Sequence, residues 1–391
     1  MKILWFPRLQ FDIDKFHMTT WREMCSELER LGHDVEIAIA GKYDKDVFDR
    51  KYIPVPVVRK KALRILSFWV NGFIKFIQSY FRFKPDVVIL DWYSIWFSLP
   101  LVFIRSNKRA IMIIDSRAPL HKLTTPRSLS NTIFKFYTWT CLLYCKYFMD
   151  GMTVITSYYK KKVCGDLKID SSLIGVWSSG VNISNFSRKK LENIDRPPFL
   201  KGKFVLMQHG EISYDRGYLE TLRALNMVKK KDVCLVLIGN SINRSKVKDE
   251  IDRLSRELGL EDNIYVLPPV AHPKIPEYIS YCDCAIMAYP NIEYWNHNNP
   301  IKLLEYLAMG KVVICTDMWT FNDVMGNEKC ACYVKDDSPD AIAEAITYCY
   351  ENRDLLPEWG RSGTRIIEQR YTWQRQAKNL IDFIESLRRK R

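Results

Sequence analysis

Short runs of apolar residues alternate with longer helical patterns along almost the whole chain. Three clear examples are PDVVIL at 85–90, AIMII at 110–114 and VCLVLI at 233–238. Runs that are apolar at nearly every position indicate strands buried on both faces, as in parallel sheets covered by crossover helices. The alternation occurs in two series of comparable size, so we predict an α/β protein made of two Rossmann-like domains.

The boundary between the two series is the segment 187–202, which reads SRKKLENIDRPPFLKG. It is charged, contains two consecutive prolines and lacks hydrophobic periodicity, all of which are typical of a linker. We therefore assign residues 1–186 to the first domain and 203–370 to the second. Gly-x-Gly-x-x-Gly is missing after the first strand, which argues against a dinucleotide site there.

The positive net charge of the chain comes from its first half. Residues 1–190 hold 31 Lys or Arg against 16 Asp or Glu, whereas residues 191–391 hold 28 against 29. A basic surface attracts nucleic acid or an anionic membrane. The basic residues are not interleaved with a recognisable nucleic-acid-binding motif, so we expect no nucleic-acid partner.

Two aromatic-rich helical segments, 62–83 and 130–149, carry Lys or Arg at intervals. Such helices can lie in a membrane interface, or they can be buried helices of a large domain, which is the commoner case. No segment reaches about 18 uninterrupted apolar residues, so we predict no transmembrane helix. The N-terminal apolar run ends at Pro7 and is too short for a signal peptide. We expect a cytoplasmic protein, with peripheral contact with the inner membrane face as an option.

The eleven cysteines predict neither disulfides nor a metal site. Most are scattered or sit in apolar runs, and the pairs Cys282/Cys284 and Cys330/Cys332 lack histidines at zinc-ligand spacing. We expect reduced thiols, most of them buried.

The stretch NNPIKLLEYLAMGKVVICTD at 298–317 combines a helix with a buried strand. One of its two asparagines can cap the helix, the proline suits the first turn, and the glycine can end it. Free N–H groups at the helix start suit a phosphate, and Glu305, one turn further on, can accept hydrogen bonds from a ribose. The alternative is a surface pair of Lys302 and Glu305 on an ordinary helix, and this stretch alone favours neither.

Four segments together resemble one known family. They are IGVWSSGVNISNF at 174–186, VLMQHGEISYDRGYLETLRAL at 205–225, IPEYISYCDCAIMAYPN at 275–291 and NPIKLLEYLAMGKVVICTD at 299–317. In this order they resemble the GT-B-fold glycosyltransferases, specifically the retaining family 4 type. The similarity covers nearly the whole chain and is strongest from about residue 171 onward.

The resemblance implies a GT-B fold, in which two Rossmann-like domains face a cleft. The first domain would bind the acceptor, the second would bind the nucleotide-sugar, and residues 371–391 would pack back on the first. The implied donor is a UDP- or GDP-linked sugar, with no further cofactor and no metal.

The resemblance also implies roles for particular residues. A leaving diphosphate is stabilised by a cationic side chain and a helix N-terminus. Arg216 matches the family's cation, Lys302 is a second cation, and both are catalytic candidates; Glu305 matches the glutamate that holds the ribose. The implied donor-binding residues are Gly210, Arg216, Gly217, Asn299, Pro300, Ile301, Lys302 and Glu305.

The sequence departs from the family pattern at the donor motif, which usually contains two glutamates eight residues apart. The position eight residues before Glu305 is His297, and the nearest upstream glutamate is Glu293. The arginine that often begins the phosphate loop is Glu211 here. These departures leave the transferred sugar and the mechanistic detail open.

Candidates for the acceptor side lie in the first domain. Asp115 and Arg117 follow an apolar strand, at the sheet edge where open α/β folds bind ligands. Asp115 is a catalytic candidate that would position an acceptor hydroxyl, and Arg117 would bind an anionic acceptor. The alternative for both is a structural salt bridge. His17 and His121 are further acceptor-binding candidates, against a local structural role.

Two hypotheses about function follow. The leading one is a metal-independent retaining glycosyltransferase whose acceptor is lipid-linked, a polysaccharide or another glycan. The alternative is a membrane-associated scaffold or partner subunit of the same fold, whose donor site has decayed, as His297 at the usual glutamate position suggests. A sugar 2-epimerase of related fold is a weaker match to the second half of the chain.

Overall fold

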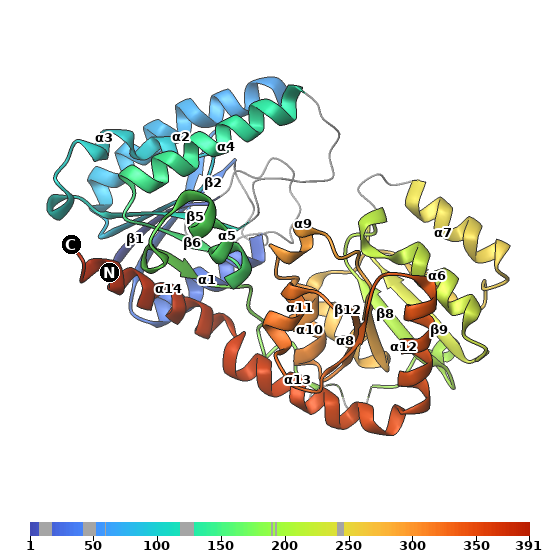
Figure 1. Cartoon of the computed structure of the whole chain (residues 1–391). Helices are drawn as coiled ribbons and strands as arrows, with labels where there is room; N and C mark the ends of the chain where they lie inside the picture. The colour runs from blue at the N-terminus through green and yellow to red at the C-terminus, as the bar shows by residue number, and fades with distance from the viewer. Residues whose placement is uncertain are drawn as a thin grey trace. The chain divides into compact units, whose positions relative to one another are not determined.

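The computed structural model describes residues 1–7, 18–41, 52–58, 60–117, 129–188, 191, 194–240 and 246–391. Its contacts divide the chain into two compact units, Met1–Gly180 with Trp373–Arg391 and Val181–Thr372 (Figure 1). This division falls just before the segment 187–202 that the sequence suggested as a linker, and the described residues of that segment belong to the second unit.

The first unit is built on a parallel sheet, which among the described residues has seven strands in the order β3-β2-β1-β4-β5-β6-β7. The strands are β1 (Lys2–Phe6), β2 (Asp34–Ala40), β3 (Ile53–Val55), β4 (Val87–Leu90), β5 (Ile111–Ser116), β6 (Gly151–Val154) and β7 (Ile174–Val176). The helices are α1 (Met18–Arg30), α2 (Lys61–Phe83), α3 (Leu99–Val102), α4 (Leu129–Phe148) and α5 (Ser157–Leu167).

The last helix of the chain, α14 (Trp373–Arg388), belongs to this first unit. Its buried Leu380 and Ile384 share a core cluster with Trp5 and Met24. Gly151 and Gly175 leave room for it, because a Cβ at either position would press on the Phe383 ring. The expected return of the C-terminal helix to the first domain is therefore confirmed.

The second unit holds a parallel sheet with six strands in its described residues, in the order β10-β9-β8-β11-β12-β13. The strands are β8 (Phe204–His209), β9 (Val233–Ile238), β10 (Ile264–Leu267), β11 (Cys284–Met287), β12 (Val312–Thr316) and β13 (Ala331–Val334). The helices are α6 (Tyr218–Met227), α7 (Lys246–Glu257), α8 (Ile275–Tyr281), α9 (Glu293–Asn296), α10 (Ile301–Ala308), α11 (Trp319–Met325), α12 (Pro339–Glu351) and α13 (Leu356–Arg370). The predicted α/β architecture with two Rossmann-like sheets is confirmed.

The strand order of the second unit determines where a ligand can bind. From β8 the chain adds strands on one side, β9 and β10, and then crosses to the other side to add β11, β12 and β13. In open parallel sheets a crevice forms outside the carboxyl ends of the strands at such a switch point. The ends of β8 and β11 therefore mark the place to look for a site.

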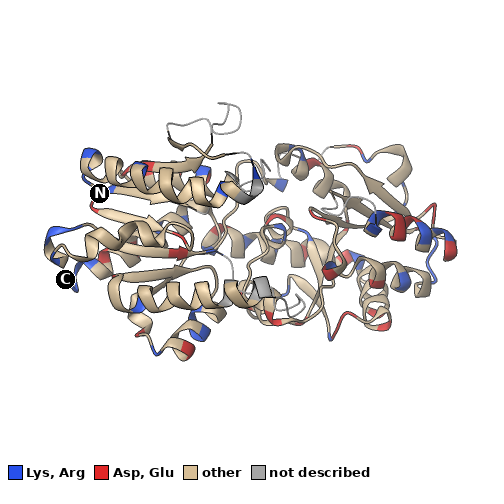
Figure 2. Ribbon diagram, turned by 90° about the horizontal axis from the view of Figure 1, so that it is seen from above, with Lys and Arg blue, Asp and Glu red and all other residues tan. Residues whose placement is uncertain are grey.

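Charge is distributed differently in the two units. Figure 2 shows Lys and Arg beside both chain ends, which lie in the first unit, while blue and red segments mix along the second. This agrees with the positive balance of the first half of the sequence.

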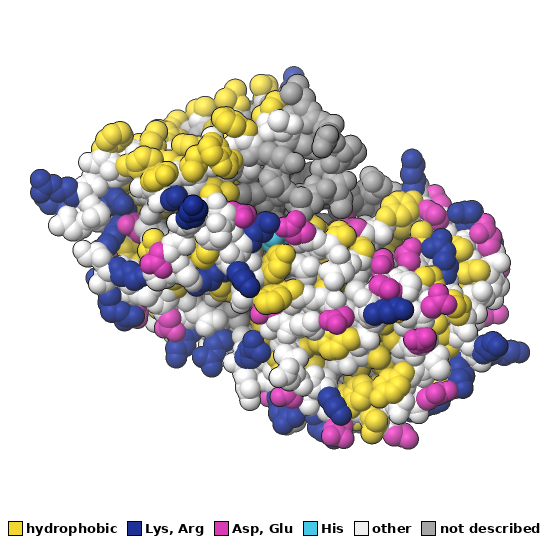
Figure 3. All heavy atoms as spheres, in the orientation of Figure 1, with side chains coloured by type: hydrophobic (Ala, Val, Ile, Leu, Met, Phe, Trp, Pro, Cys, Tyr) yellow, Lys and Arg dark blue, Asp and Glu magenta, His cyan; other side chains and the backbone are white. Residues whose placement is uncertain are grey.

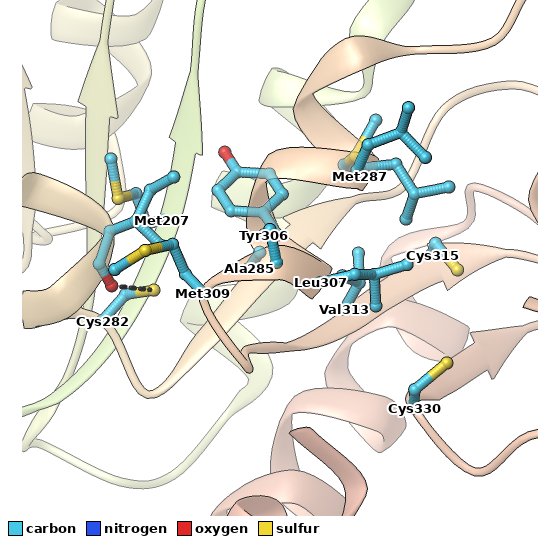
Figure 4. Close-up of a cluster of buried hydrophobic side chains, with 14 of the residues drawn as sticks. Met207, Cys282, Ala285, Met287, Tyr306, Leu307, Met309, Val313, Cys315 and Cys330 are labelled. Atoms are coloured by element: carbon cyan, nitrogen blue, oxygen red, sulfur yellow. Dashed lines mark hydrogen bonds between the residues drawn. The ribbon is translucent and has the colours of Figure 1, made fainter. Parts of the chain in front are cut away.

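Helix α10 is anchored in the core of the second unit. Its Leu303, Leu304 and Leu307 are fully buried, and so is the ring of Tyr306. Figure 4 shows Tyr306 and Leu307 among Met207 of β8, Ala285 and Met287 of β11, and Val313 of β12. A helix held this firmly can position polar side chains from its first turns at the sheet edge.

Candidate functional site

The backbone at the carboxyl ends of β8 and β9 is packed too closely for side chains. A Cβ on Gly239 would overlap the carbonyl oxygen of Gly210, and a Cβ on Gly217 would overlap that of Ala288. Gly210 and Gly217 also have positive φ angles, 100° and 69°, which only glycine adopts readily. Glycine at these positions lets the loop after β8 fold tightly over the sheet edge.

This packing yields a prediction for stability. Gly239→Ala is expected to lower the free energy of unfolding by about 1–3 kcal/mol, because the added methyl group must displace the Gly210 backbone. Urea unfolding measures the effect. The control is Gly165→Ala in α5, where a Cβ meets no atom within 4 Å, so that no loss is expected. Equal stability of Gly239→Ala and wild type would show that the two loops do not pack as described.

Lys302 brings a buried cation to this sheet edge from the first turn of α10. Only 8% of the residue is exposed, and its Nζ has no hydrogen-bond partner in the described part of the chain. The end of its side chain lies against Gly210, where a Cβ would stand 2.6 Å from Nζ. Burial, together with the charge of Arg216, holds the pKa of Lys302 well below its ordinary value. A buried ammonium group without a hydrogen-bond partner is unfavourable, and a bound anion would stabilise it.

Arg216 lies at the end of the loop that follows β8, in the short turn Tyr214–Arg216. Its Nη2 donates to Glu211 Oε2 at 3.0 Å, and its guanidinium lies 5.4 Å from the centre of the Trp295 ring. The Arg216 side chain is 14% exposed, and its Nε has no partner among the described residues. The buried Lys302 and the partly buried Arg216 are thus close enough for the charge of one to lower the pKa of the other, and Glu211 is the ion-pair partner of Arg216.

Glu305 lies one turn further along α10 and is not on the surface. Its side chain is 1% exposed, and both carboxylate oxygens accept hydrogen bonds from histidines. His209 Nε2 donates to Oε2 at 2.8 Å, and His272 Nε2 donates to Oε1 at 2.6 Å. Burial alone would raise the pKa of Glu305, but these hydrogen bonds outweigh it and hold the pKa at about 2. Glu305 is therefore an ionised carboxylate, and the surface pair with Lys302 considered above is wrong.

The hydrogen-bond network continues inward from His209 to Tyr306. The backbone N–H of His209 donates to the Tyr306 hydroxyl at 2.8 Å, and His209 Nδ1 lies 2.7 Å from the same oxygen. Burial lowers the pKa of His209, so the ring is neutral and carries its one proton on Nε2, facing the carboxylate. Nδ1 then accepts from the Tyr306 hydroxyl. Hydrogen bonds thus connect four side chains in series, and we call this group the Glu305 network: Tyr306, His209, Glu305 and His272.

The outer end of the Glu305 network is His272. It lies in the short turn His272–Lys274, and its side chain is 24% exposed, whereas those of His209 and Glu305 are 1% exposed. The His272 ring also packs 5.4 Å from the ring of Phe186. A ligand hydroxyl can therefore reach Glu305 Oε1 most directly from the side where His272 lies.

The start of α10 differs from the expectation. The sequence predicted that Asn298 or Asn299 would cap the helix and that Pro300 would lie in its first turn. In the structure Pro300 is itself the N-cap residue, with extended backbone angles, and no side chain caps the helix. Asn299 is buried and Asn298 Nδ2 donates to the Tyr294 carbonyl. The prediction was wrong because Pro300 has no N–H and holds the preceding residues in an extended path.

The absence of a side-chain cap affects the chemistry of this helix. The N–H groups of the first turn, at Ile301 and Lys302, point along the helix axis without a capping oxygen. The positive end of the helix dipole therefore adds to the positive charge of the Lys302 side chain.

His297 occupies the position of the missing glutamate. Its side chain is 4% exposed, and its Nε2 lies 3.8 Å from Glu293 Oε1, one helical turn earlier. The Glu293 side chain is 35% exposed, so its carboxylate is the more solvent-accessible member of this pair. The structure thus brings a carboxylate and an imidazole together here, although the sequence pattern placed no carboxylate at position 297.

The acceptor-side candidates lie in the first unit. Asp115 is buried and accepts from Thr153 Oγ1 at 2.8 Å, and burial raises the pKa of Asp115 to about 6. The Arg117 guanidinium packs 3.6 Å from the centre of the Trp177 ring, and its Nη1 donates to the Trp177 carbonyl at 2.7 Å. His17 and His121 lie outside the described residues.

The structure therefore brings most of the expected donor-side residues together in one unit. Gly210, Arg216, Gly217, Lys302 and Glu305 surround the ends of β8 and β11 and the start of α10. Sequence reasoning missed His209, His272 and Tyr306. Only His209 gave a signal, since it directly precedes the loop glycine at the end of a predicted strand. Over the ranges that the structure describes, no group of three or more His, Cys, Asp or Glu side chains is placed to hold a metal ion.

Comparisons with protein families match both halves of the chain. Residues 189–366 match the model described as glycosyl transferases group 1, and residues 19–185 match the model described as glycosyltransferase family 4. An uncharacterised glycosyltransferase of Methanocaldococcus jannaschii is 22% identical over 391 residues, covering 95% of this chain and 94% of that protein.

Solved structures share the fold at low sequence identity. A glycosyltransferase from Rickettsia africae superposes with a TM-score of 0.76 at 17% identity, covering 100% of this chain and 99% of that chain. The HepE protein of Anabaena, solved with UDP, has a TM-score of 0.77 at 14% identity, with 99% and 100% covered. Sucrose-phosphate synthase of Thermosynechococcus elongatus has a TM-score of 0.76 at 14% identity, with both chains fully covered.

Proposed function

The chain belongs to the GT-B glycosyltransferases of the group 1 and family 4 type, and from this premise we propose that it transfers a sugar from a nucleoside-diphosphate sugar to a lipid-linked, polysaccharide or other glycan acceptor. The observation that carries the proposal is Lys302, a buried ammonium group with no partner in the described structure, held against Gly210 at the switch point of the sheet. Diphosphate is the ligand chemistry that best matches such a site.

Lys302 and Arg216 are proposed to act on the leaving diphosphate. As the bond from the anomeric carbon to the diphosphate oxygen breaks, negative charge grows on the diphosphate. Two cations and the start of α10 already surround the position near Gly210 and do not need to reorganise. This arrangement supports a transfer that does not need a metal ion, and retention of the anomeric configuration is inferred from the family type.

Glu305 is proposed to hold the ribose hydroxyls of the donor. Its ionised carboxylate is oriented from the inside by His209, so Oε1 is the oxygen that a ribose hydroxyl would use, next to or in place of His272. The remaining donor-side residues of the proposal are Gly217, Asn299, Pro300 and Ile301, which shape the loop and the helix start.

On the acceptor side, Asp115 remains our proposed group for an acceptor hydroxyl. Its raised pKa of about 6 suits a group that exchanges a proton near neutral pH. The cation–π contact of Arg117 with Trp177 gives that side chain a structural partner of its own, whereas an acceptor-binding role stays a proposal.

UDP is the first nucleotide to test, because the Anabaena HepE protein was solved with UDP and with UDP-glucose. The experiment is a screen of UDP-, GDP- and ADP-sugars for thermal stabilisation, since a ligand at 100 times its Kd stabilises by about 2.7 kcal/mol. Stabilisation by one nucleotide class, followed by slow hydrolysis of its sugar, is the expected result. No response to any nucleotide would contradict the proposal.

A decayed donor site is the competing account, and Lys302 argues against it. An unpaired buried lysine destabilises a fold, so a site without a ligand gains nothing from keeping one. His297 in place of the usual glutamate is compatible with an active site because Glu293 supplies a carboxylate one turn away.

A further inference from the structure

One surface of the first unit combines features that the proposed chemistry does not use. Helix α2 is amphipathic, and its large apolar side chains extend well beyond the side that packs on the sheet. Phe68, Phe76 and Phe83 pack on the sheet, and Gly72 allows the Phe97 ring to approach closely. An amphipathic helix normally buries its apolar side and leaves its polar side to solvent. The structure covers only one side of α2.

The uncovered side of α2 and the adjoining side of α4 form a continuous surface, which we call the apolar face. Its members are large apolar side chains that are all more than a third exposed: Leu63, Leu66, Trp69, Val70, Phe73 and Ile74 on α2, and Ile133, Phe136, Trp139, Tyr147 and Phe148 on α4. Trp69 stacks on Tyr137 at a ring distance of 6.2 Å, which joins the two helices. Figure 3 shows the yellow side chains gathered where α2 and α4 run in Figure 1.

The spacing of these residues shows that they form stripes along the helices. On α2 they recur every three or four residues, from Leu63 through Leu66 and Val70 to Phe73 and Ile74. This period places them on one side of the helix. Contiguous exposed apolar surface of this extent marks an interaction site in soluble domains.

The charges on α2 and α4 indicate which kind of partner fits the apolar face. Residues 61–83 contain four Lys or Arg and residues 129–148 contain two, and neither helix contains Asp or Glu. Two copies of such a face would bring like charges together with no opposite charges to pair them, which disfavours a symmetric dimer. An anionic lipid surface complements both properties, because its headgroups attract Lys and Arg and its acyl boundary accepts apolar side chains.

The Trp and Tyr side chains of the apolar face also favour a lipid surface as the partner. Trp and Tyr side chains prefer the boundary between headgroups and acyl chains, where one part of the ring is apolar and the other hydrated. Trp69, Trp139 and Tyr147 lie on the apolar face, with Trp139 52% exposed. No helix in the described ranges is both long enough and apolar enough to cross a membrane. We propose that the apolar face of α2 and α4 docks the protein flat on an anionic membrane surface.

The test is flotation of the full chain with vesicles of phosphatidylglycerol and phosphatidylcholine in equal parts. Wild type is expected to float with these vesicles, and more weakly as salt is raised, because screening reduces the attraction of Lys and Arg to the headgroups. Val70→Glu combined with Phe136→Glu puts two acidic groups on the face and is expected to lower the bound fraction at least tenfold.

The matched control is Met227→Glu combined with Leu355→Glu, which makes the same charge change at exposed apolar residues of the second unit. It is expected to float as wild type does. Failure of wild type to bind the vesicles, or equal binding by Val70→Glu/Phe136→Glu, would overturn the proposal. So would a wild-type dimer, seen by sedimentation, that this variant converts to a monomer. Nucleotide affinity is expected to be the same in all three proteins, so this outcome is separate from the proposed function.

Discussion

Replacing Lys302 with methionine is expected to stabilise the fold while removing most of the activity. The substitution keeps a long, flexible side chain but removes an ammonium group that is 8% exposed and has no partner in the described residues. Removing this desolvated charge is expected to raise the free energy of unfolding by about 1–3 kcal/mol. Losing a cation at the leaving diphosphate is expected to lower kcat/KM about 100- to 1,000-fold.

Opposite signs of these two effects distinguish a functional residue from a structural one. Lys311, nine residues along, provides the control, because its Nζ donates to the carbonyls of Ser280 and Cys282. Lys311→Met is expected to lower the free energy of unfolding by about 1–2 kcal/mol and to leave nucleotide affinity unchanged. Urea unfolding and steady-state kinetics measure both variants. A Lys302→Met protein that is less stable and fully active would reverse the assignment.

The pH dependence of stability provides a second readout for Lys302. Its pKa in the folded protein is below the ordinary value of 10.5. Between these two values the unfolded chain holds the proton and the folded chain does not, so the free energy of unfolding rises with pH in that window. Diphosphate affinity is expected to fall over the same window as the ammonium group loses its charge. Both trends are expected to disappear in Lys302→Met.

Replacing Glu305 with glutamine is expected to lower both stability and donor affinity. The carboxylate accepts one N–H from His209 and one from His272, and an amide can accept from only one of them while its NH₂ faces the other donor. The loss in the free energy of unfolding is expected to be about 2–4 kcal/mol. Nucleotide affinity is expected to fall about 10- to 100-fold, the size of a hydrogen bond to a charged group.

The acid limb of the stability curve tests the charge state of Glu305. Its pKa of about 2 is below the ordinary 4.5, so its stabilisation is full above that ordinary value and is lost as the pH falls towards 2. Glu305→Gln is expected to lack this contribution. The control is Glu344→Gln at an exposed position of α12, where no change is expected. An unchanged free energy of unfolding and an unchanged nucleotide affinity in Glu305→Gln would show that the Glu305 network contributes to neither.

Much of the fold follows from the sequence because its main signal is local. Runs such as VCLVLI and VVIC are apolar at every position, and a parallel sheet buries them on both faces. The shorter elements were missed, including α9 and α11, because four to seven residues give too little periodicity. Between β4 and β5 the chain forms the 3-10 turn Ile95–Ser98 and then the short α3 rather than one longer helix, since Pro100 lies at the start of α3.

The candidate site was only partly visible in the sequence. Lys302 and Glu305 belong to one segment whose pattern is characteristic, so they were predicted. The partners of Glu305 are 96 and 33 residues away in the sequence, and no local pattern links them to it. The cap of α10 was wrong because asparagine is a good N-cap in general, but the proline that follows imposed another path. Our proposal for Lys302 rests on its burial, which only the structure shows.

The central claim is that the second unit binds the diphosphate of a nucleotide-sugar through Lys302. Calorimetric titration of wild type and Lys302→Met with a nucleoside diphosphate and with its nucleoside tests it most directly. The pair is UDP and uridine, or the corresponding pair for another base if the nucleotide screen selects one. Wild type is expected to bind the diphosphate at least 100-fold more tightly than the nucleoside, and Lys302→Met is expected to lose most of that ratio while its nucleoside affinity is kept. An unchanged ratio in Lys302→Met, or a wild type that binds neither ligand, would contradict the account.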